Sequence, residues 1–273
     1  MFPSIPIECI KHDELEKLVH TNGSRTIVYV YYHNNNSHFA ARKFAYCKDW
    51  IVPIFIPRSS YMESEVYRHH FMQLQHNWTE HYDFVLTCTF RHTVPTETRV
   101  TPLSTESLKH MIKTAVHMNY DVMPLEIYPI FDIKYSLLRF HGRNSFKAFS
   151  SLLEKKGYNR NQIEKSGDIR AFWRSSFLIR SSVMQNLTNW MVNAMHIVDN
   201  DTDVKWWFKH DAVYFSGDPI VAFQVFGTPY YQMHPFIFER LPAFYLSMER
   251  KSVYFYNRSV PIVPVVENST MLS

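Results

Sequence analysis

The first half of the chain alternates short apolar runs with longer segments of helical spacing. Each run is rich in β-branched and aromatic residues and is bounded by polar or turn-forming residues, which is typical of a buried strand. The intervening segments, such as 104–119, carry apolar residues three and four positions apart, as on one face of a helix. Strands that alternate with helices favour an α/β fold in which they are neighbours in one mainly parallel sheet with helices on both faces. The four predicted strands are residues 27–32, 51–56, 83–90 and 122–127.

The alternation ends near residue 130, and helical patterns dominate the second half of the chain. No repeat, low-complexity segment or linker rich in Pro, Gly or Ser interrupts the chain, so we expect a single domain over residues 1–273. The tail at 267–273 is expected to be frayed. The predicted helices are 38–50, 62–77, 104–119, 133–140, 145–156, 182–198 and 235–248, and extended segments are predicted at 172–180, 253–256 and 260–266.

Composition narrows the class of protein. Hydrophobic residues make up 46% of the 273 residues and aromatic residues 16%, which is enough for a sizeable core. The 29 basic and 25 acidic residues give a net charge of only +4, and the basic residues are scattered, so we expect no nucleic-acid partner. The three cysteines form no C-x-x-C pattern, which favours a reducing compartment and argues against structural zinc. The 6 glycines form neither a G-x-G-x-x-G motif nor a P-loop.

Two kinds of membrane signal are missing from the sequence. No apolar run approaches the roughly 18–20 residues that a membrane-spanning helix needs, so we expect at most peripheral membrane contact. The N-terminal residues carry prolines and charges where a signal peptide would have its apolar core. These patterns predict a cytoplasmic protein.

An acidic segment at 199–203 contains two overlapping D-x-D patterns, formed by Asp199, Asp201 and Asp203. Carboxylates at this spacing can hold a magnesium or manganese ion (Mg or Mn) that bridges the diphosphate of a nucleotide sugar, because such cations prefer oxygen ligands. Clusters of Asp, Asn and Thr are also typical of helix caps and turns. The sequence leaves both interpretations open.

A second candidate, Glu239, lies among many aromatic residues near the end of the chain. A charged pair such as Glu239 and Arg240 in apolar surroundings must reach solvent in a cleft or be paired. A carboxylate in an aromatic cleft has the setting that raises its pKa towards general-base catalysis. The alternative is an ion pair, with Arg240 or another partner, that fixes this helix.

Several segments together resemble a family of bacterial glycosyltransferases from capsule and lipopolysaccharide loci. The segments Tyr61-Met-Glu63-Ser-Glu65-Val-Tyr67 and Asn77-Trp78 are similar to that family's E-L-T-A-x-Y-W and W-K-N motifs. The segment from Tyr82 to His92 is similar to D-Y-x-G-L-x-H-Y-R-R, and Phe238-Glu239-Arg240-Leu241 to a terminal x-E-R-L-L motif. Each motif is degenerate, and the order and spacing over roughly residues 26–265 carry the resemblance.

The resemblance implies a GT-A-like fold with a nucleotide-binding half at 1–130 and an acceptor half at 131–266. It implies a transferase that moves a sugar from a nucleotide-diphosphate sugar to a hydroxyl of a glycan acceptor, with Glu239 as the base. The alternatives are a catalytically inactive sugar- or nucleotide-binding homologue and a structural interaction protein. Open α/β sheets bind ligands beyond the carboxyl ends of their strands. His33 and Asn34, which follow the first predicted strand, are therefore also expected in the donor site. The expected donor-binding residues are His33, Asn34, Glu63, Glu65, Arg91 and Arg240.

Overall fold

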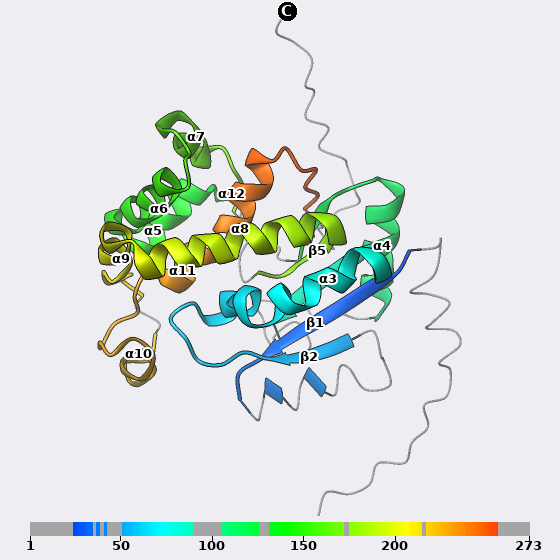
Figure 1. Ribbon diagram of the computed structural model, residues 1–273, viewed down its shortest axis with the longest axis horizontal. Coiled ribbons are helices and arrows are strands. Elements are labelled where there is room, and N and C mark those ends of the chain that lie inside the picture. Colours follow the sequence, from blue (N-terminus) through cyan, green and yellow to red (C-terminus); the bar gives the residue numbers. More distant parts are fainter. Residues whose placement is uncertain are drawn as a thin grey trace, which may run out of the picture.

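A five-stranded mixed sheet forms the centre of the fold (Figure 1). The computed structural model describes residues 24–34, 37–38, 41–42, 51–89, 105–125, 131–171, 175–214 and 217–255. The sheet has the order β2-β1-β3-β5-β4, in which β1 pairs in parallel with β2 and β3, and β5 pairs antiparallel with β3 and β4. β5 therefore runs opposite to the other four. The strands are β1 (Thr26–Tyr32), β2 (Ile51–Phe55), β3 (Phe84–Thr89), β4 (Val122–Pro124) and β5 (Phe177–Arg180).

The α/β class and the first three predicted strands are confirmed, because β2, β1 and β3 are parallel neighbours. The predicted place of the fourth strand is wrong. β4 runs in the expected direction, but β5 lies between it and β3, so the sheet is mixed at that side. The sequence pattern marks Phe177–Arg180 as extended and apolar, yet a four-residue run carries no signal for its direction or its neighbours. Residues on both sides of position 130 therefore build the sheet.

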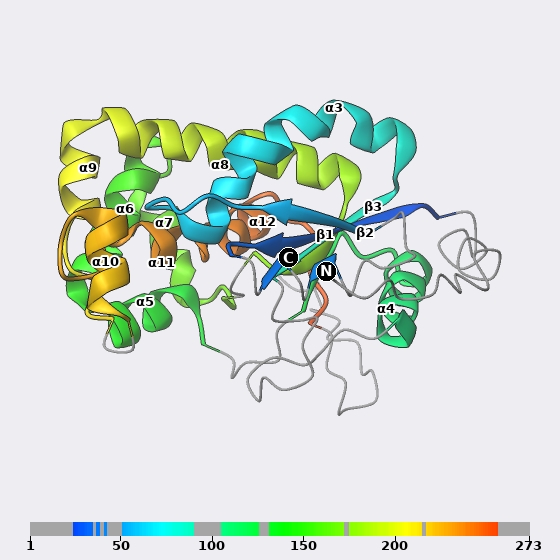
Figure 2. The same cartoon turned by 90° about the horizontal axis from the view of Figure 1, so that it is seen from below.

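The two faces of the sheet belong to two separate apolar clusters, as the alternation along β1 shows. Tyr29 and Tyr31 point to the face covered by α3 (Met72–His81) and α8 (Ser181–Asn200), whereas Val28 and Val30 point to the face covered by α4 (Thr105–His117). Figure 2 shows α3 and α8 above the sheet and α4 below it. Burial on both faces explains why β1 and β3 are continuous apolar runs.

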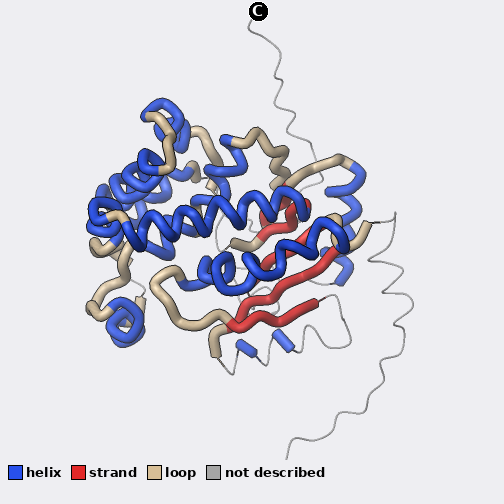
Figure 3. The backbone as a smooth tube through the Cα atoms, in the orientation of Figure 1, coloured by secondary structure: helices blue, strands red, loops and turns tan. Residues whose placement is uncertain are grey.

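Most of the remaining helices gather at one end of the sheet, and α8 runs from the sheet into this helical half (Figures 1 and 3). The predicted helices 133–140, 145–156 and 182–198 are confirmed, with ends shifted by one or two residues. The predicted helix 235–248 is two helices, because Pro242 lacks a backbone N–H and begins a new helix. The helical half contains α5 (Ile133–His141), α6 (Arg143–Lys155), α7 (Arg160–Glu164), α9 (Thr202–Phe208), α10 (Pro219–Phe226), α11 (His234–Phe238) and α12 (Leu241–Met248).

The segment between β2 and β3 connects the sheet to the helical half. It contains a 3-10 turn, η2 (Met62–Glu65), and a π-helical turn, η3 (Tyr67–Phe71), before α3, where the sequence predicts one helix over 62–77. η2 packs against α11, so segments far apart in the sequence meet beyond the carboxyl end of β2. Within the described residues, no helix has the length and apolar character needed to cross a bilayer.

Candidate functional site

The loop that follows β1 is fastened by one serine. Ser37 Oγ accepts hydrogen bonds from the backbone N–H groups of His33 and Asn34, both at 3.0 Å. Asn34 Oδ1 in turn accepts a hydrogen bond from the Ser37 backbone N–H at 2.9 Å. This reciprocal pairing is typical of a tight turn. His33 and Asn34 are therefore held at the carboxyl end of β1.

His33 lies beside Glu63, which belongs to η2. His33 Nε2 is 3.6 Å from Glu63 Oε1, and the two side chains are 27% and 19% exposed. The structure thus brings together two residues that the sequence predicts in the donor site. An imidazole and a carboxylate at a strand end can exchange hydrogen bonds with the hydroxyl groups of a sugar or a ribose.

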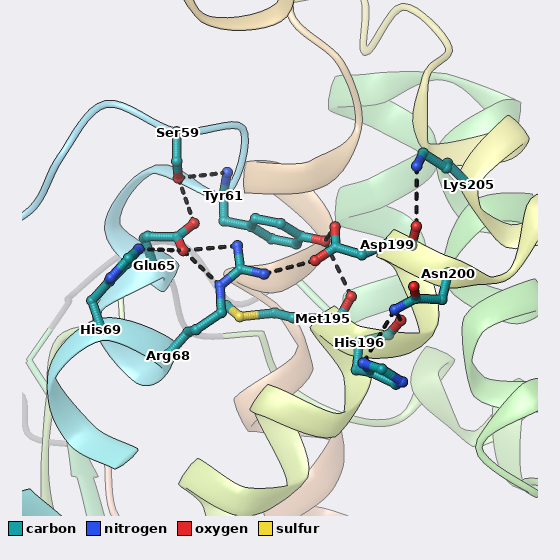
Figure 4. A network of polar contacts seen from close by, with 10 residues as sticks. All are labelled: Ser59, Tyr61, Glu65, Arg68, His69, Met195, His196, Asp199, Asn200 and Lys205. Atoms are coloured by element: carbon teal, nitrogen blue, oxygen red, sulfur yellow. Dashed lines mark hydrogen bonds and ion pairs between the residues drawn. The ribbon is translucent and has the colours of Figure 1, made fainter. Parts of the chain in front are cut away.

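Glu65, another predicted donor-site residue, is enclosed by protein groups, as Figure 4 shows. Only 1% of its side chain is exposed. Its Oε2 accepts a hydrogen bond from Ser59 Oγ at 2.6 Å, and its Oε1 is 2.8 Å from Arg68 Nε and 3.1 Å from His69 Nε2. A carboxylate surrounded in this way holds η2 and η3 in place and leaves little room for a ligand.

Arg68 connects Glu65 to Asp199 at the C-terminal end of α8 (Figure 4). Its Nη1 is 2.6 Å from Asp199 Oδ2, and its guanidinium lies 5.1 Å from the centroid of the Tyr61 ring. Burial lowers the pKa of Arg68, but the hydrogen bonds and charges of the two carboxylates outweigh burial and raise it. Tyr61 donates a hydrogen bond from its hydroxyl to Asp199 Oδ1 at 2.7 Å, and burial together with this carboxylate raises the pKa of Tyr61. Asp199 is therefore held by two side chains from the segment after β2.

Asp201, another predicted metal ligand, has a role at the junction of α8 and α9. Asp201 Oδ1 accepts hydrogen bonds from the backbone N–H groups of Asp203 and Val204, which caps α9. Its second oxygen is 2.8 Å from Lys155 Nζ, and the hydrogen bond from Lys155 lowers the pKa of Asp201. No three His, Cys, Asp or Glu side chains in the described part of the chain form a group that could hold a metal ion. Asp199 and Asp201 are thus engaged by protein groups, and a magnesium or manganese ion at this acidic segment stays a prediction.

Arg240 is buried in the helical half. Its Nε donates a hydrogen bond to Ser136 Oγ at 2.8 Å, its Nη1 donates to the carbonyl oxygen of Phe236, and its Nη2 is 3.3 Å from His141 Nε2. A donor phosphate would have to compete with these protein groups. The environment of Arg240 therefore does not support the predicted phosphate contact.

Glu239 follows the last residue of α11, and its Oε2 is 3.5 Å from Arg240 Nη1. The sequence leaves two roles open for Glu239, a catalytic base or a member of an ion pair. The contact with Arg240 is such an ion pair. The Glu239 side chain is nevertheless 21% exposed, and α11 packs against η2, the turn that carries Glu63. Glu239, the predicted base, thus lies at the end of α11, and α11 contacts the turn that carries the predicted donor-site residue Glu63.

Sequence reasoning missed Arg68 and Tyr61 as functional candidates. Glu65 and Arg68 are three positions apart, so their contact could be predicted from helical spacing. The contacts of both residues with Asp199 depend on how α8 crosses the segment after β2, and no local pattern encodes that crossing. Arg91, predicted to bind the donor diphosphate, lies outside the described residues.

Two buried histidines predict a loss of stability in mild acid. Burial, helped by the charge of Arg240, lowers the pKa of His141 to about 3, and burial lowers the pKa of His234 to about 4. An unfolded histidine titrates near pH ~6.5, so below that pH the unfolded chain binds protons that the folded protein does not. Between pH 7 and pH 5 each histidine should reduce the free energy of unfolding by about 2 kcal/mol.

Urea unfolding at these two pH values measures the effect of the histidines. His141→Gln should show a smaller difference between the two pH values than the wild type, whatever its stability at pH 7. Equal free energies of unfolding at pH 7 and pH 5 in the wild type would show that these histidines are not held neutral by the fold.

Comparison with known proteins shows little similarity. No protein-family model and no curated protein sequence matches the chain. Among solved structures, the apo structure of the bifunctional glycosyltransferase WbbM is similar with a TM-score of 0.43 and 12% sequence identity. The alignment covers 89% of this chain and 48% of that chain, so this protein spans about half the length of its structural neighbour. A TM-score of this size does not show that the two folds are the same.

Proposed function

We propose that this protein is a glycosyltransferase that moves a sugar from a nucleotide-diphosphate sugar to a hydroxyl of a glycan. The observation that carries the proposal is the pair of His33 and Glu63, 3.6 Å apart at the carboxyl end of β1. Ligands of α/β sheets bind beyond such strand ends. Glu63 also belongs to the first of the segments that resemble the glycosyltransferase family.

In the proposed GT-A-like arrangement, the donor binds over the ends of β1 and β3, and the acceptor approaches from the helical half. Glu63 accepts a hydrogen bond from a hydroxyl of the donor, and Arg91 contacts its diphosphate, as an arginine does with two parallel hydrogen bonds. Glu239 takes the proton of the acceptor hydroxyl as that oxygen forms a bond to the sugar and the diphosphate departs. No step is assigned to a metal ion, because Asp199 and Asp201 are held by Arg68, Tyr61 and Lys155.

The donor site can be tested with Glu63→Gln, which keeps the size of the side chain and removes its charge. Hydrogen bonds to a charged acceptor contribute about 1.5–3 kcal/mol, so the substitution should weaken donor binding roughly tenfold or more. Isothermal titration with nucleoside diphosphates and nucleotide-diphosphate sugars gives the affinity.

Glu154→Gln is the matched control, because Glu154 is an exposed glutamate on α6 in the helical half. It should bind the donor as the wild type does. An unchanged affinity in Glu63→Gln would place the donor away from the end of β1.

A further inference from the structure

Several buried hydroxyl groups of this protein have no hydrogen-bond partner among the described residues. Buried polar groups are paired in most folded proteins, so each exception needs a structural or functional reason. Four of these hydroxyl groups belong to residues at or beside the carboxyl ends of β1 and β3, and we name them the hydroxyl cluster. Its members are Tyr31, Tyr67, Thr89 and Ser175.

Strand pairing and ring contacts bring three members of the hydroxyl cluster to one face of the sheet. Tyr31 and Thr89 are register partners on β1 and β3. Tyr67 packs edge-on against Phe71, with ring centroids 5.6 Å apart, and the Phe71 ring also lies 6.3 Å from the ring of Tyr31. These residues therefore lie on the face of the sheet that α3 and α8 cover.

Ser175 is the fourth member. Its carbonyl oxygen accepts a hydrogen bond from Thr87 Oγ1 at 2.5 Å, which places it beside β3. The Ser175 hydroxyl group lies near that of Tyr67, and the Thr87 hydroxyl group lies near that of Tyr31, but neither phenol oxygen meets its neighbour in hydrogen-bond geometry. Burial raises the pKa of both tyrosines, and the neighbouring hydroxyl groups offset only part of the rise. Both phenols therefore stay protonated and can donate.

The hydroxyl cluster adjoins the proposed donor site along two segments of the chain. Tyr31 precedes His33 by two residues, and Tyr67 follows Glu63 by four residues. The hydroxyl group of Ser64, next to Glu63 in η2, is also buried without a partner among the described residues. Unpartnered hydroxyl groups therefore occur both at the end of β1 and in the turn that carries Glu63.

The backbone near the cluster is irregular at three places. Met62 at the start of η2 and Ser175 both have a φ of +47°, in the left-handed region that residues with a side chain seldom adopt. Tyr67 begins the π-helical turn η3, and such turns are frequent at functional sites. Strained backbone of this kind also gathers at binding sites. The free protein thus carries unpartnered hydroxyl groups and strained backbone in one region.

We propose that the hydroxyl cluster binds hydroxyl groups of the donor's sugar. This inference rests on the proposed function and names the chemistry of the sugar site. The hydroxyl groups of Tyr, Thr and Ser each donate and accept hydrogen bonds, as those of a sugar do. The cluster contains no charged side chain, so it matches neutral hydroxyl groups and not a phosphate or a carboxylate. Because the cluster is buried in the free protein, the sugar enters as the start of η2, at Met62, moves away from the end of β1.

The stability and the ligand affinity of Tyr67→Phe together test the proposal. The substitution removes an unpartnered hydroxyl group and keeps the ring, so the melting temperature of the free protein should stay the same or rise by about 2–4 °C. The affinity for a nucleotide-diphosphate sugar should fall about threefold to tenfold, because a hydrogen bond to the sugar is lost. The affinity for the nucleoside diphosphate alone should not change. Thermal unfolding and isothermal titration give these quantities.

Tyr29→Phe is the matched control, because Tyr29 lies on the same face of β1 and its hydroxyl oxygen accepts a hydrogen bond from Trp78 Nε1 at 3.0 Å. This variant should have a lower melting temperature than the wild type and should bind both ligands as the wild type does.

Three results with Tyr67→Phe would overturn the proposal. The variant could bind the nucleotide sugar as well as the wild type does, it could lose affinity equally for the nucleoside diphosphate, or its melting temperature could fall as far as that of Tyr29→Phe. In each case the wild type still binds the donor, so the proposed function stands. A wild type that binds no nucleotide sugar contradicts both the proposed function and this inference.

Discussion

Replacing Glu239 by glutamine is expected to lower the rate of donor consumption by roughly a hundredfold or more, while folding and donor affinity persist. The amide keeps the shape of the side chain and most of its hydrogen bonding, but it cannot take a proton from the acceptor hydroxyl. Positioned general bases contribute rate factors of about 10²–10⁴, and this sets the size of the expected loss. The measurement is the release of nucleoside diphosphate from a nucleotide-diphosphate sugar in the presence of a glycan acceptor, together with the melting temperature.

The alternative role of Glu239 is an ion pair with Arg240. Its carboxylate is 3.5 Å from the guanidinium of the buried Arg240, and the loss of this pair could loosen the contact between α11 and α5. A variant whose melting temperature falls together with its activity would identify Glu239 as part of this ion pair. Glu249→Gln is the control, because Glu249 is an exposed glutamate at the end of the next helix, α12, and should leave both quantities unchanged.

Replacing Arg68 by methionine is expected to reduce the free energy of unfolding by about 3–5 kcal/mol, because removal of one partner leaves a buried charge unpaired. Glu65 is almost completely buried and would keep only Ser59 and His69 as partners, and Asp199 also loses an ion pair at 2.6 Å. Methionine keeps much of the aliphatic stem that packs near Tyr61. Chemical denaturation at neutral pH measures the change.

A double-variant comparison separates the buried charge from general packing. Glu65→Gln/Arg68→Met removes both charges and should cost clearly less than the sum of the two single substitutions. Arg160→Met, on the exposed side of α7, should change the free energy of unfolding by no more than about 0.5 kcal/mol. If Arg68→Met is as stable as this control, the contacts around Glu65 contribute little to the fold.

The fold could be predicted from the sequence where burial leaves a strong local pattern. β1, β2 and β3 are buried apolar runs, and helix-length segments between them predict parallel strands with covered faces. The position of β5 could not be predicted in this way. Its four residues pair antiparallel with both β3 and β4, which are distant in the sequence, and a run this short carries no signal for such partners.

Residues of the candidate site could likewise be selected from the sequence only where a local pattern marks them. The sequence could select His33 and Glu63 as candidates, because one follows a strand end and the other belongs to a motif with a family resemblance, and the structure places them side by side. The spacing of Asp199 to Asp201 and Asp203 predicts a metal ligand, whereas its observed contacts are long-range. Arg68 and Tyr61 approach it from the segment after β2, and spacing along the chain carries no information on such a contact.

Turnover of nucleotide-diphosphate sugars by the purified protein tests the proposed function most directly. A panel of donors is incubated with the wild type and a panel of glycan acceptors, with and without magnesium or manganese, and both donor binding and release of nucleoside diphosphate are measured. We expect at least one donor to bind and to be consumed, with binding weakened in Glu63→Gln and turnover lost in Glu239→Gln. A protein that binds a donor without consuming it, or that binds none of them, would contradict the assignment as a glycosyltransferase.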